Sequence, residues 1–314
     1  MRVLLALGGN AMTSPDGAAR PEDQIAAIQT AMSAAARLVR AGHELVVTHG
    51  NGPQVGNLLV KNELAAQVVP PVPLDWCGAQ TQGTLGFTIV SALESALRAD
   101  GDHTPVAALV TRTLVDAADP GFTTPTKPIG RSLTREQAQP MIEHGQIWSE
   151  RKQSDGSSVW RRVVASPDPL EVLDTPAIAA LIGSGFVVCC AGGGGIPVVR
   201  DGDGSVRGVE AVIDKDLTAA LLARTLDCDV LVIATDVDHA AVGWGTPSQR
   251  SLGSISAAEL RDHADAGEFA AGSMGPKVAA ALRFVEQGGP RSVITSLTHI
   301  TEAVAGEFGT VIAA

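Results

Sequence analysis

Six short apolar runs of strand length recur along the chain, and most of them end in a turn rich in glycine or polar residues. None shows the clean alternation of apolar and polar residues that marks a strand with one face in water. Continuous apolar runs of this length are typical of strands in a parallel sheet that is covered on both faces. The runs span residues 3–7, 44–48, 106–110, 186–191, 230–234 and 292–295.

Amphipathic stretches of helical length separate these runs. Strands that alternate with helices predict an α/β fold with a mostly parallel central sheet. In open sheets of this kind ligands bind at the carboxyl ends of the strands, and the glycine turns fall at those ends. The expected helices span about residues 21–41, 53–66, 75–99, 175–184, 214–226, 256–266 and 275–287.

Residues 116–164 interrupt this pattern, because they are rich in proline, glycine, threonine and charge. Residues 147–152 and 159–164 flank the turn-forming segment 154–157, which predicts a β-hairpin. A long surface loop is the simpler alternative, but stretches of this length are more often functional or separately folded. We therefore expect a small subdomain inserted in the first lobe of the protein.

The composition fits a well-buried globular chain, and its charge limits the ligands that it can bind. Hydrophobic residues make up 45% of the 314 residues and charged residues 18%, which suits one large α/β domain or two lobes. The formal net charge of -11 argues against nucleic acid as a main partner. An anionic ligand would have to be held by a few local cations and backbone dipoles.

The four cysteines, Cys77, Cys189, Cys190 and Cys228, have neither the spacing of a metal site nor that of a disulfide framework. We expect them to pack in the core of a protein from a reducing compartment. No signal peptide is visible at the start of the sequence, and no apolar stretch reaches the length of a membrane span. These features predict a cytoplasmic protein with no membrane partner.

Lysine is scarce, and three of the five lysines lie in turns that are suited to anions. Lys127 lies in the Thr- and Pro-rich segment 124–130, Lys215 between Asp214 and Asp216, and Lys277 at the end of the glycine-containing segment 272–277. Lysine is a compact point charge and arginine a planar fork, so the two are not interchangeable at a phosphate. Coincidence is the simpler explanation, but the surroundings of these lysines favour anion binding.

Glycine-rich turns follow three of the expected strands. Gly8, Gly9 and Asn10 follow the first strand, where bare backbone N–H groups can hold an anion. Gly50, Asn51 and Gly52 precede Pro53, which is suited to the first turn of a helix, and a helix N-terminus is a ready anion site. The spacing also resembles a dinucleotide fingerprint, but no acidic residue follows at the expected distance. Function is also favoured for the run 192–195, since four glycines contribute no packing.

Charged residues lie at the expected starts of two helices. Asp214 and Asp216 suit the positive end of a helix dipole whether or not a ligand binds, but Lys215 gains nothing there. Lys277 also falls in the first turn of a helix, so an anion is expected near both lysines. Residues 235–238, Thr-Asp-Val-Asp, follow a strand and could hold a ribose or a metal, or cap the next turn.

No Ser/His/Asp or Cys/His arrangement stands out, and the seven histidines have no metal spacing. The sequence therefore offers no obvious general base. Phosphoryl transfer to an acceptor that is already ionised needs no base, only positioning and the neutralisation of charge.

Together these segments resemble the carbamate kinase family of the amino-acid kinase superfamily over nearly the whole chain. The resemblance implies a three-layer αβα sandwich and the reaction ATP + carbamate ⇌ ADP + carbamoyl phosphate, with Mg²⁺ held mainly by the phosphates and no side-chain metal ligand assigned. It also implies a homodimer. The matching segments are 7–11, 49–57, 73–75, 77–79, 119–120, 125–130, 161–164, 166–167, 191–197, 208–216, 235–238, 272–277 and 309–311.

The resemblance also implies roles for individual residues. Residues 1–205 would form an N-terminal lobe that binds the acceptor and carries the inserted subdomain, about 116–164, while residues 206–314 would bind the nucleotide. The expected catalytic residues are Lys127, Lys215, Lys277, Asp216 and Asn10. The expected substrate-binding residues are Gly8, Gly9, Gly50, Asn51, Gly52, Gly193 and Gly194, and the expected nucleotide-binding residues are Asp214, Thr235, Asp236, Val237, Asp238, Met274 and Gly275.

The sequence departs from the family pattern at two places. Arg131, Ser132 and Leu133 stand where the family usually has Pro-Phe-Tyr, which leaves open a kinase of the same fold that acts on another small carboxylate or carbamate-like acid. Ala241 stands where the family usually places a tyrosine against the nucleotide base, and Trp244 or His239 could compensate. A non-catalytic metabolite sensor is the alternative from another functional class.

Overall fold

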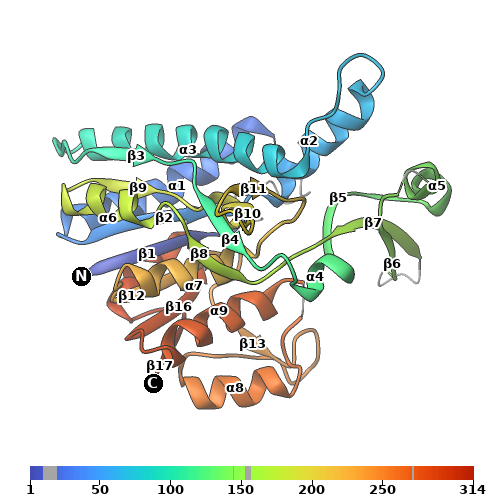
Figure 1. Cartoon of the computed structure of the whole chain (residues 1–314). Helices are drawn as coiled ribbons and strands as arrows, with labels where there is room; N and C mark the ends of the chain where they lie inside the picture. Colours follow the sequence, from blue (N-terminus) through green and yellow to red (C-terminus); the bar gives the residue numbers. More distant parts are fainter. Residues whose placement is uncertain (10–19, 144, 153–156, 271) are drawn as a thin grey trace.

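The computed structural model describes residues 1–9, 20–143, 145–152, 157–270 and 272–314 (Figure 1). The helices are α1 (Pro21–Arg40), α2 (Gly52–Ala65), α3 (Leu74–Arg98), α4 (Pro120–Thr123), α5 (Arg135–Glu143), α6 (Thr175–Gly183), α7 (Lys215–Thr225), α8 (Ala257–Asp265), α9 (Met274–Glu286) and α10 (Ile300–Ala305). The strands are β1 (Arg2–Leu7), β2 (Glu44–His49), β3 (Val106–Ala108), β4 (Arg112–Val115), β5 (Lys127–Leu133), β6 (Trp148–Lys152), β7 (Ser158–Val164), β8 (Pro169–Val172), β9 (Val187–Cys189), β10 (Ile196–Arg200), β11 (Val206–Gly208), β12 (Val230–Thr235), β13 (Ala241–Val242), β14 (Arg250–Ser251), β15 (Ser254–Ser256), β16 (Arg291–Ser296) and β17 (Thr310–Ala313).

An eight-stranded sheet forms the centre of the molecule, with the strand order β15-β17-β16-β12-β1-β2-β9-β3. The six strands from β16 to β3 are parallel to their neighbours, and only the β16–β17 pairing is antiparallel. The mostly parallel sheet predicted from the sequence is therefore confirmed. Each of the six predicted apolar runs forms one of its strands.

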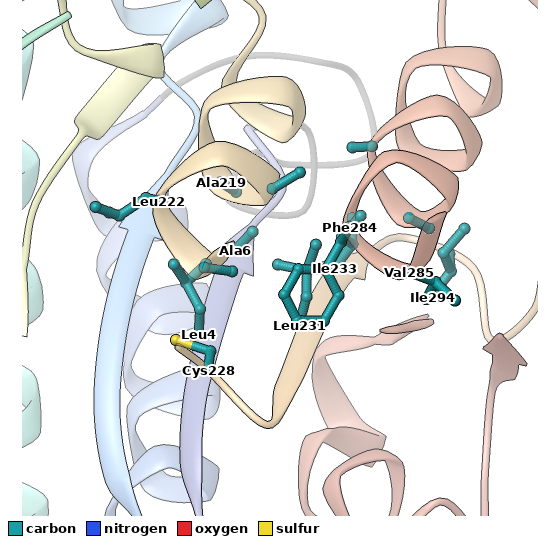
Figure 2. Close-up of a cluster of buried hydrophobic side chains, with 14 of the residues drawn as sticks. Leu4, Ala6, Ala219, Leu222, Cys228, Leu231, Ile233, Phe284, Val285 and Ile294 are labelled. Carbon is teal, nitrogen blue, oxygen red and sulfur yellow. The ribbon is translucent and has the colours of Figure 1, made fainter. Parts of the chain in front are cut away.

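Helices cover both faces of this sheet. Successive side chains of a strand point to opposite faces, so an apolar strand presents an apolar surface on each face. In β1, Val3 and Leu5 pack into a core with α1, α3 and α10, whereas Leu4 and Ala6 pack into a second core with α6, α7, α8 and α9. Part of the second core is drawn in Figure 2, where Phe284 of α9 lies beside Leu231 and Ile233 of β12. The layered αβα arrangement predicted from the sequence is confirmed.

The inserted segment folds as a three-stranded antiparallel sheet, β5-β7-β6, with α5 packed on it. It projects from the main body in Figure 1 and has a small core of its own around Leu133, Ala138 and Trp148. The predicted hairpin corresponds to β6 and β7, and residues 154–156 of its predicted turn lie outside the described residues. At its root, Ile129 and Val164 share a cluster with Val55 and Leu59, which joins the subdomain to α2.

Two predicted strands are shorter than expected. The runs 106–110 and 186–191 form strands only over Val106–Ala108 and Val187–Cys189. After β9 the chain leaves the sheet at Ala191, which adopts a left-handed conformation with a φ of 51° and is followed by the 3-10 turn Gly192–Gly194. Within the described residues, no helix is long and apolar enough to cross a membrane.

Candidate active site

A cavity of about 370 Å³ opens at the carboxyl ends of β1, β2 and β12. Gly8 and Gly9 follow β1, Gly50 follows β2, and Thr235 ends β12, so three neighbouring strands each deliver a turn to the cavity. The other lining residues are Asn51, Gly52, Pro53, Lys127, Gly193, Val212, Ile213, Asp214, Lys215, Asp216, Asp236, Val237, Ala241, Trp244, Glu268, Phe269, Ala270, Gly272, Ser273, Met274, Pro276 and Lys277.

Three helices also begin at this cavity. Gly52, Lys215 and Met274 are the first residues of α2, α7 and α9, and all three line the cavity. The first turn of a helix leaves backbone N–H groups without intrahelical partners, and the helix dipole adds partial positive charge there. The arrangement is therefore suited to a ligand with several anionic groups, such as a polyphosphate.

Two carboxylates hold the three lysines that the sequence singled out. Asp216 pairs with Lys215 through one carboxylate oxygen and with Lys277 through the other, whose Oδ2 lies 3.5 Å from Lys277 Nζ. Lys127 Nζ lies 2.7 Å from Asp214 Oδ2, although Lys127 comes from the inserted subdomain. Asp216 is almost fully buried, so it fixes both Lys215 and Lys277. The cluster carries three positive and two negative charges.

Asp214 has a second task as the N-cap of α7. Its Oδ1 accepts a hydrogen bond of 2.9 Å from the backbone N–H of Asp216, which satisfies one free donor of the first turn. Burial alone would raise the pKa of the Asp214 carboxyl, but the charge and hydrogen bond of Lys127 and the charge of Lys215 outweigh it, so the pKa is lowered. Asp214 therefore remains ionised and keeps its hold on Lys127.

Gly50 is required because the turn after β1 passes directly over it. A Cβ at this position would lie 2.6 Å from the backbone nitrogen of Gly9 and 3.1 Å from Cδ of Lys215. Beside it, the buried Asn51 donates a hydrogen bond of 2.8 Å to Thr81 Oγ1 of α3. The two glycine turns and Lys215 are thus in direct contact.

We expect Gly50→Ala to lower kcat/KM by about tenfold or more, because the methyl group would displace both the Gly9 turn and the Lys215 side chain. The comparison is with Gly253→Ala, since a Cβ at Gly253 meets nothing within 4 Å. Steady-state kinetics and thermal unfolding of both variants provide the measurement. Equal kinetics for Gly50→Ala and the unmodified protein would mean that this contact does not shape the site.

The glycine run packs beneath the cavity rather than simply facing it. A Cβ at Gly193 would lie 2.1 Å from Nδ2 of Asn51, and a Cβ at Gly194 would lie 2.8 Å from the carbonyl oxygen of Ile213. Both residues have a positive φ, which favours glycine. Gly193 lines the cavity, whereas Gly194 does not, so the structure does not bring this predicted substrate-binding residue to the cavity wall.

His49, the last residue of β2, is buried directly behind the glycine turns. Its Nδ1–H donates to the carbonyl oxygen of Gly50 over 3.0 Å, and its ring closely approaches Gly192. Burial lowers the pKa of His49 to about 4; the hydrogen bond to Gly50 opposes this shift and the charge of Lys215 adds to it. The ring is therefore neutral in the folded protein near neutral pH.

Acid should destabilise the fold through His49. As the pH falls below 6.5 the unfolded chain takes up a proton that the folded chain refuses until the pH approaches about 4. Over that window we expect the free energy of unfolding to decrease by roughly 3 kcal/mol from this residue alone. Denaturant unfolding at several pH values, compared with His49→Asn, isolates the contribution. The same pH slope in both proteins would contradict it.

Residues 237–274 supply the largely apolar part of the cavity. Val237, Ala241, Trp244, Phe269 and Met274 line it, and Thr235 Oγ1 donates a hydrogen bond of 3.0 Å to Asp236 Oδ1. Two predicted nucleotide-binding residues do not line the cavity. Asp238 instead lies 3.5 Å from His299 Nδ1, and the backbone N–H of Gly275 donates to the carbonyl oxygen of Ala270.

Sequence reasoning missed several lining residues, above all Glu268, Phe269 and Ala270. They lie just before the glycine-containing segment 272–277, and this proximity is the only signal that could have identified them. Of the two residues suggested to replace the absent tyrosine, Trp244 lines the cavity and His239 does not; His239 packs against Phe308 instead. The predicted catalytic residue Asn10 lies outside the described residues.

Arg131, the unusual residue of the inserted subdomain, is not part of the cavity wall. Its guanidinium lies 3.5 Å from Glu63 Oε2 on α2. Nearby, Gly130 approaches α2 so closely that a Cβ on Gly56 would lie 3.4 Å from its Cα. Arg131 therefore belongs to the contact between the subdomain and α2.

Comparison with known proteins gives a consistent result. Residues 1–296 match the sequence model of the amino acid kinase family. The carbamate kinase of Thermococcus kodakarensis is 44% identical over 312 residues, which cover 98% of both chains. Carbamate kinase 1 of Enterococcus faecium is 42% identical over 314 residues, which cover 99% of this chain and 98% of the other. The structure of carbamate kinase from Giardia lamblia bound to AMP-PNP has a TM-score of 0.91 at 41% identity and covers 99% of this chain and 98% of the other.

Proposed function

Because the chain belongs to the carbamate kinases of the amino acid kinase family, we propose that it transfers a phosphoryl group reversibly between ATP and carbamate. Running from carbamoyl phosphate and ADP, it makes ATP. The observation that carries this proposal is the cluster of three lysines held by Asp214 and Asp216 at the starts of helices. Such a cluster is suited to a phosphoryl group in transit between two anions.

The chemistry requires little beyond position and charge. Carbamate is already an anion, so its oxygen can attack the terminal phosphorus of ATP without a general base. Lys215 and Lys277 neutralise the charge on the equatorial oxygens of the transferring group, and Asp216 orients both lysines. Lys127 approaches from the acceptor side. The backbone N–H groups at the starts of α2, α7 and α9 stabilise the remaining negative charge.

The proposed division of labour follows the two lobes. Residues 1–205 would bind the acceptor through Gly8, Gly9, Asn51 and their neighbours, and residues 206–314 would bind the nucleotide. The central sheet is continuous between them through the pairing of β1 with β12. This continuity supports a rigid relation between the acceptor and nucleotide sites.

The nucleotide would bind together with Mg²⁺. No group of three His, Cys, Asp or Glu residues in the described part of the chain is arranged as a metal site. The residues present fit an ion that is held mainly by phosphate oxygens, since Mg²⁺ usually keeps few protein ligands in such sites. When bound, the ion supplies charge neutralisation on the phosphates next to that of the lysines.

The direct test is ATP formation from ADP, Mg²⁺ and carbamoyl phosphate. The proposal expects ATP well above the level made by a Lys215→Ala control. Formation of no more ATP than in that control would exclude the activity. A parallel screen with other acyl phosphates tests the alternative acceptors. Carbamate is favoured because Arg131, the reason for considering another acid, contacts α2 rather than the cavity.

A non-catalytic metabolite sensor is the less favoured function. It predicts that nucleotide stabilises the protein against unfolding without any turnover. The complete lysine cluster argues against it, because binding alone does not need charges placed around a transferring group. The same ATP assay decides between the two.

We further propose that the protein is a cytoplasmic homodimer that associates through α3. Phe87 of α3 is 71% exposed, and Gly83 lies one turn before it on the same face, where an added Cβ would meet nothing within 4 Å. An outer helix face with an exposed aromatic ring beside a glycine is suited to close packing against a second copy. Sedimentation should give the mass of a dimer, and Phe87→Glu should give that of a monomer. A monomeric unmodified protein would contradict the proposal.

A further inference from the structure

We propose that Trp244 stacks on the nucleobase, and that base recognition by stacking lets the enzyme use other purine nucleoside diphosphates nearly as well as ADP. The inference rests on the proposed function and goes further, because it names the residue that determines nucleotide specificity. Trp244 lies in the loop between β13 and β14 and lines the cavity, yet it is 65% exposed. An indole ring so exposed beside a cavity is available to a flat ligand.

The backbone around Trp244 forms a turn that hydrogen bonds close. Gly243 and Gly245, on either side of it, have φ values of 63° and 75°, which favour glycine. The loop is closed by a hydrogen bond of 2.7 Å from Thr246 Oγ1 to the carbonyl oxygen of Gly243. The N–H of Gly245 donates to Gln249 Oε1 over 3.0 Å. The exposed position of Trp244 is therefore fixed by the conformation and the hydrogen bonds of this turn.

A further hydrogen bond joins this loop to the segment that contains Glu268, which also lines the cavity. The backbone N–H of Gly243 donates over 2.9 Å to Oε2 of Glu268. The residues next to Glu268, Phe269 and Ala270, line the cavity, and α9 with Met274 follows. This hydrogen bond fixes the loop that carries the indole relative to the segment that carries these apolar side chains. The arrangement suits the ring of a nucleobase inserted between them.

The space beside Trp244 is open because the neighbouring side chain is small. Ala241 lines the cavity and is only 7% exposed, so it forms a low wall and leaves room for a ligand. Val237 and Met274 extend the apolar surface. Within this part of the cavity, the large aromatic faces come from Trp244 and Phe269.

Few side chains can read the edge of a base. Among the lining residues that the structure describes there is no Gln, Arg or His, and Asn51 donates to Thr81. One oxygen of Glu268 is occupied by the Gly243 N–H, and Asp236 accepts from Thr235. Because every base has a π-face, stacking alone discriminates weakly between bases, although it contributes about 1–3 kcal/mol per base. The site should therefore favour purines over pyrimidines and distinguish little among purines.

Binding of ADP, GDP and inorganic pyrophosphate to the protein and to Trp244→Ala tests the inference. We expect Kd values for ADP and GDP within about fivefold of each other, each rising about tenfold in Trp244→Ala, which corresponds to about 1.4 kcal/mol. The Kd for pyrophosphate, which has no base, should not change. Trp244→Phe should recover most of the affinity, because it keeps an aromatic face for the base.

Intrinsic fluorescence supplies a readout that is independent of turnover. The other tryptophans, Trp76, Trp148 and Trp160, do not line the cavity, so ADP should quench a signal that Trp244→Ala lacks. Trp76→Phe is the matched control, since Trp76 is similarly exposed at 61%, and it should keep the quench.

Unchanged ADP binding in Trp244→Ala would overturn the inference. So would a rise in Kd for pyrophosphate equal to that for ADP, or discrimination of more than about 10² against GDP by the unmodified protein. A protein that shows the expected binding but forms no ATP from carbamoyl phosphate would instead contradict the proposed function alone.

Discussion

Lys215→Ala and Lys277→Ala should each lower kcat by about 10²- to 10³-fold, while KM for ADP rises much less. Both ammonium groups are held by the buried Asp216, so in the proposed reaction they would meet the transferring phosphoryl group without having to reorganise. Charges that are fixed in advance stabilise the transition state more than the ground state. The reason is that the negative charge on the equatorial oxygens of the phosphoryl group is distributed differently in the transition state. Removing one of them should therefore appear mainly in kcat.

Two comparisons separate this effect from a loss of folding. Lys61→Ala removes an exposed lysine from α2 and should leave kcat unchanged, since Lys61 does not line the cavity. Lys215→Arg keeps the charge but replaces a compact ammonium by a planar fork, and it should restore little of the lost rate. Thermal unfolding of each variant shows whether the fold survives. A folded Lys215→Ala enzyme with normal kcat would exclude a role in phosphoryl transfer.

The central sheet could be predicted because its signals are local. Runs such as 3–7 and 230–234 are apolar throughout, and burial on both faces of a parallel sheet produces that pattern. The edge strand β15 and its neighbour β17 gave no such signal, and they are only three and four residues long. Their pairing depends on contacts between segments more than fifty residues apart, such as Ser254 with Val311. Local periodicity does not report contacts of this kind.

The site was predicted in part for a similar reason. A lysine beside acids at a helix start is unusual in any sequence, so Lys215 was identifiable from its neighbours alone. That Asp214 pairs with Lys127 was not identifiable, since these residues lie 87 positions apart and belong to different substructures. Glycines such as Gly194 were expected to face the ligand, but the crowding around Ile213 shows that some glycines serve packing beneath the cavity.

Lys127→Ala should raise KM for carbamoyl phosphate and lower kcat/KM by about 10²-fold, with a smaller fall in kcat. Lys127 is the one lysine of the cluster that comes from the inserted subdomain, and its partner Asp214 caps the helix that begins with Lys215. A charge-assisted hydrogen bond to an anionic ligand is worth about 1.5–3 kcal/mol, which corresponds to a loss of this size. Because the contact exists before transfer, the loss should fall mainly on binding of the acceptor.

The subdomain itself provides the matched control. Lys152 lies on β6 of the same subdomain and is exposed, so Lys152→Ala removes the same charge without touching the cavity. Its kinetics should equal those of the unmodified enzyme. If Lys127→Ala also left KM and kcat for carbamoyl phosphate unchanged, the subdomain would not contribute to the acceptor site, and the pair with Asp214 would only fasten it to the second lobe. A raised KM with Lys127→Ala alone would instead mean that the subdomain closes the acceptor side of the cavity, with Asp214 holding Lys127 until substrate replaces the carboxylate.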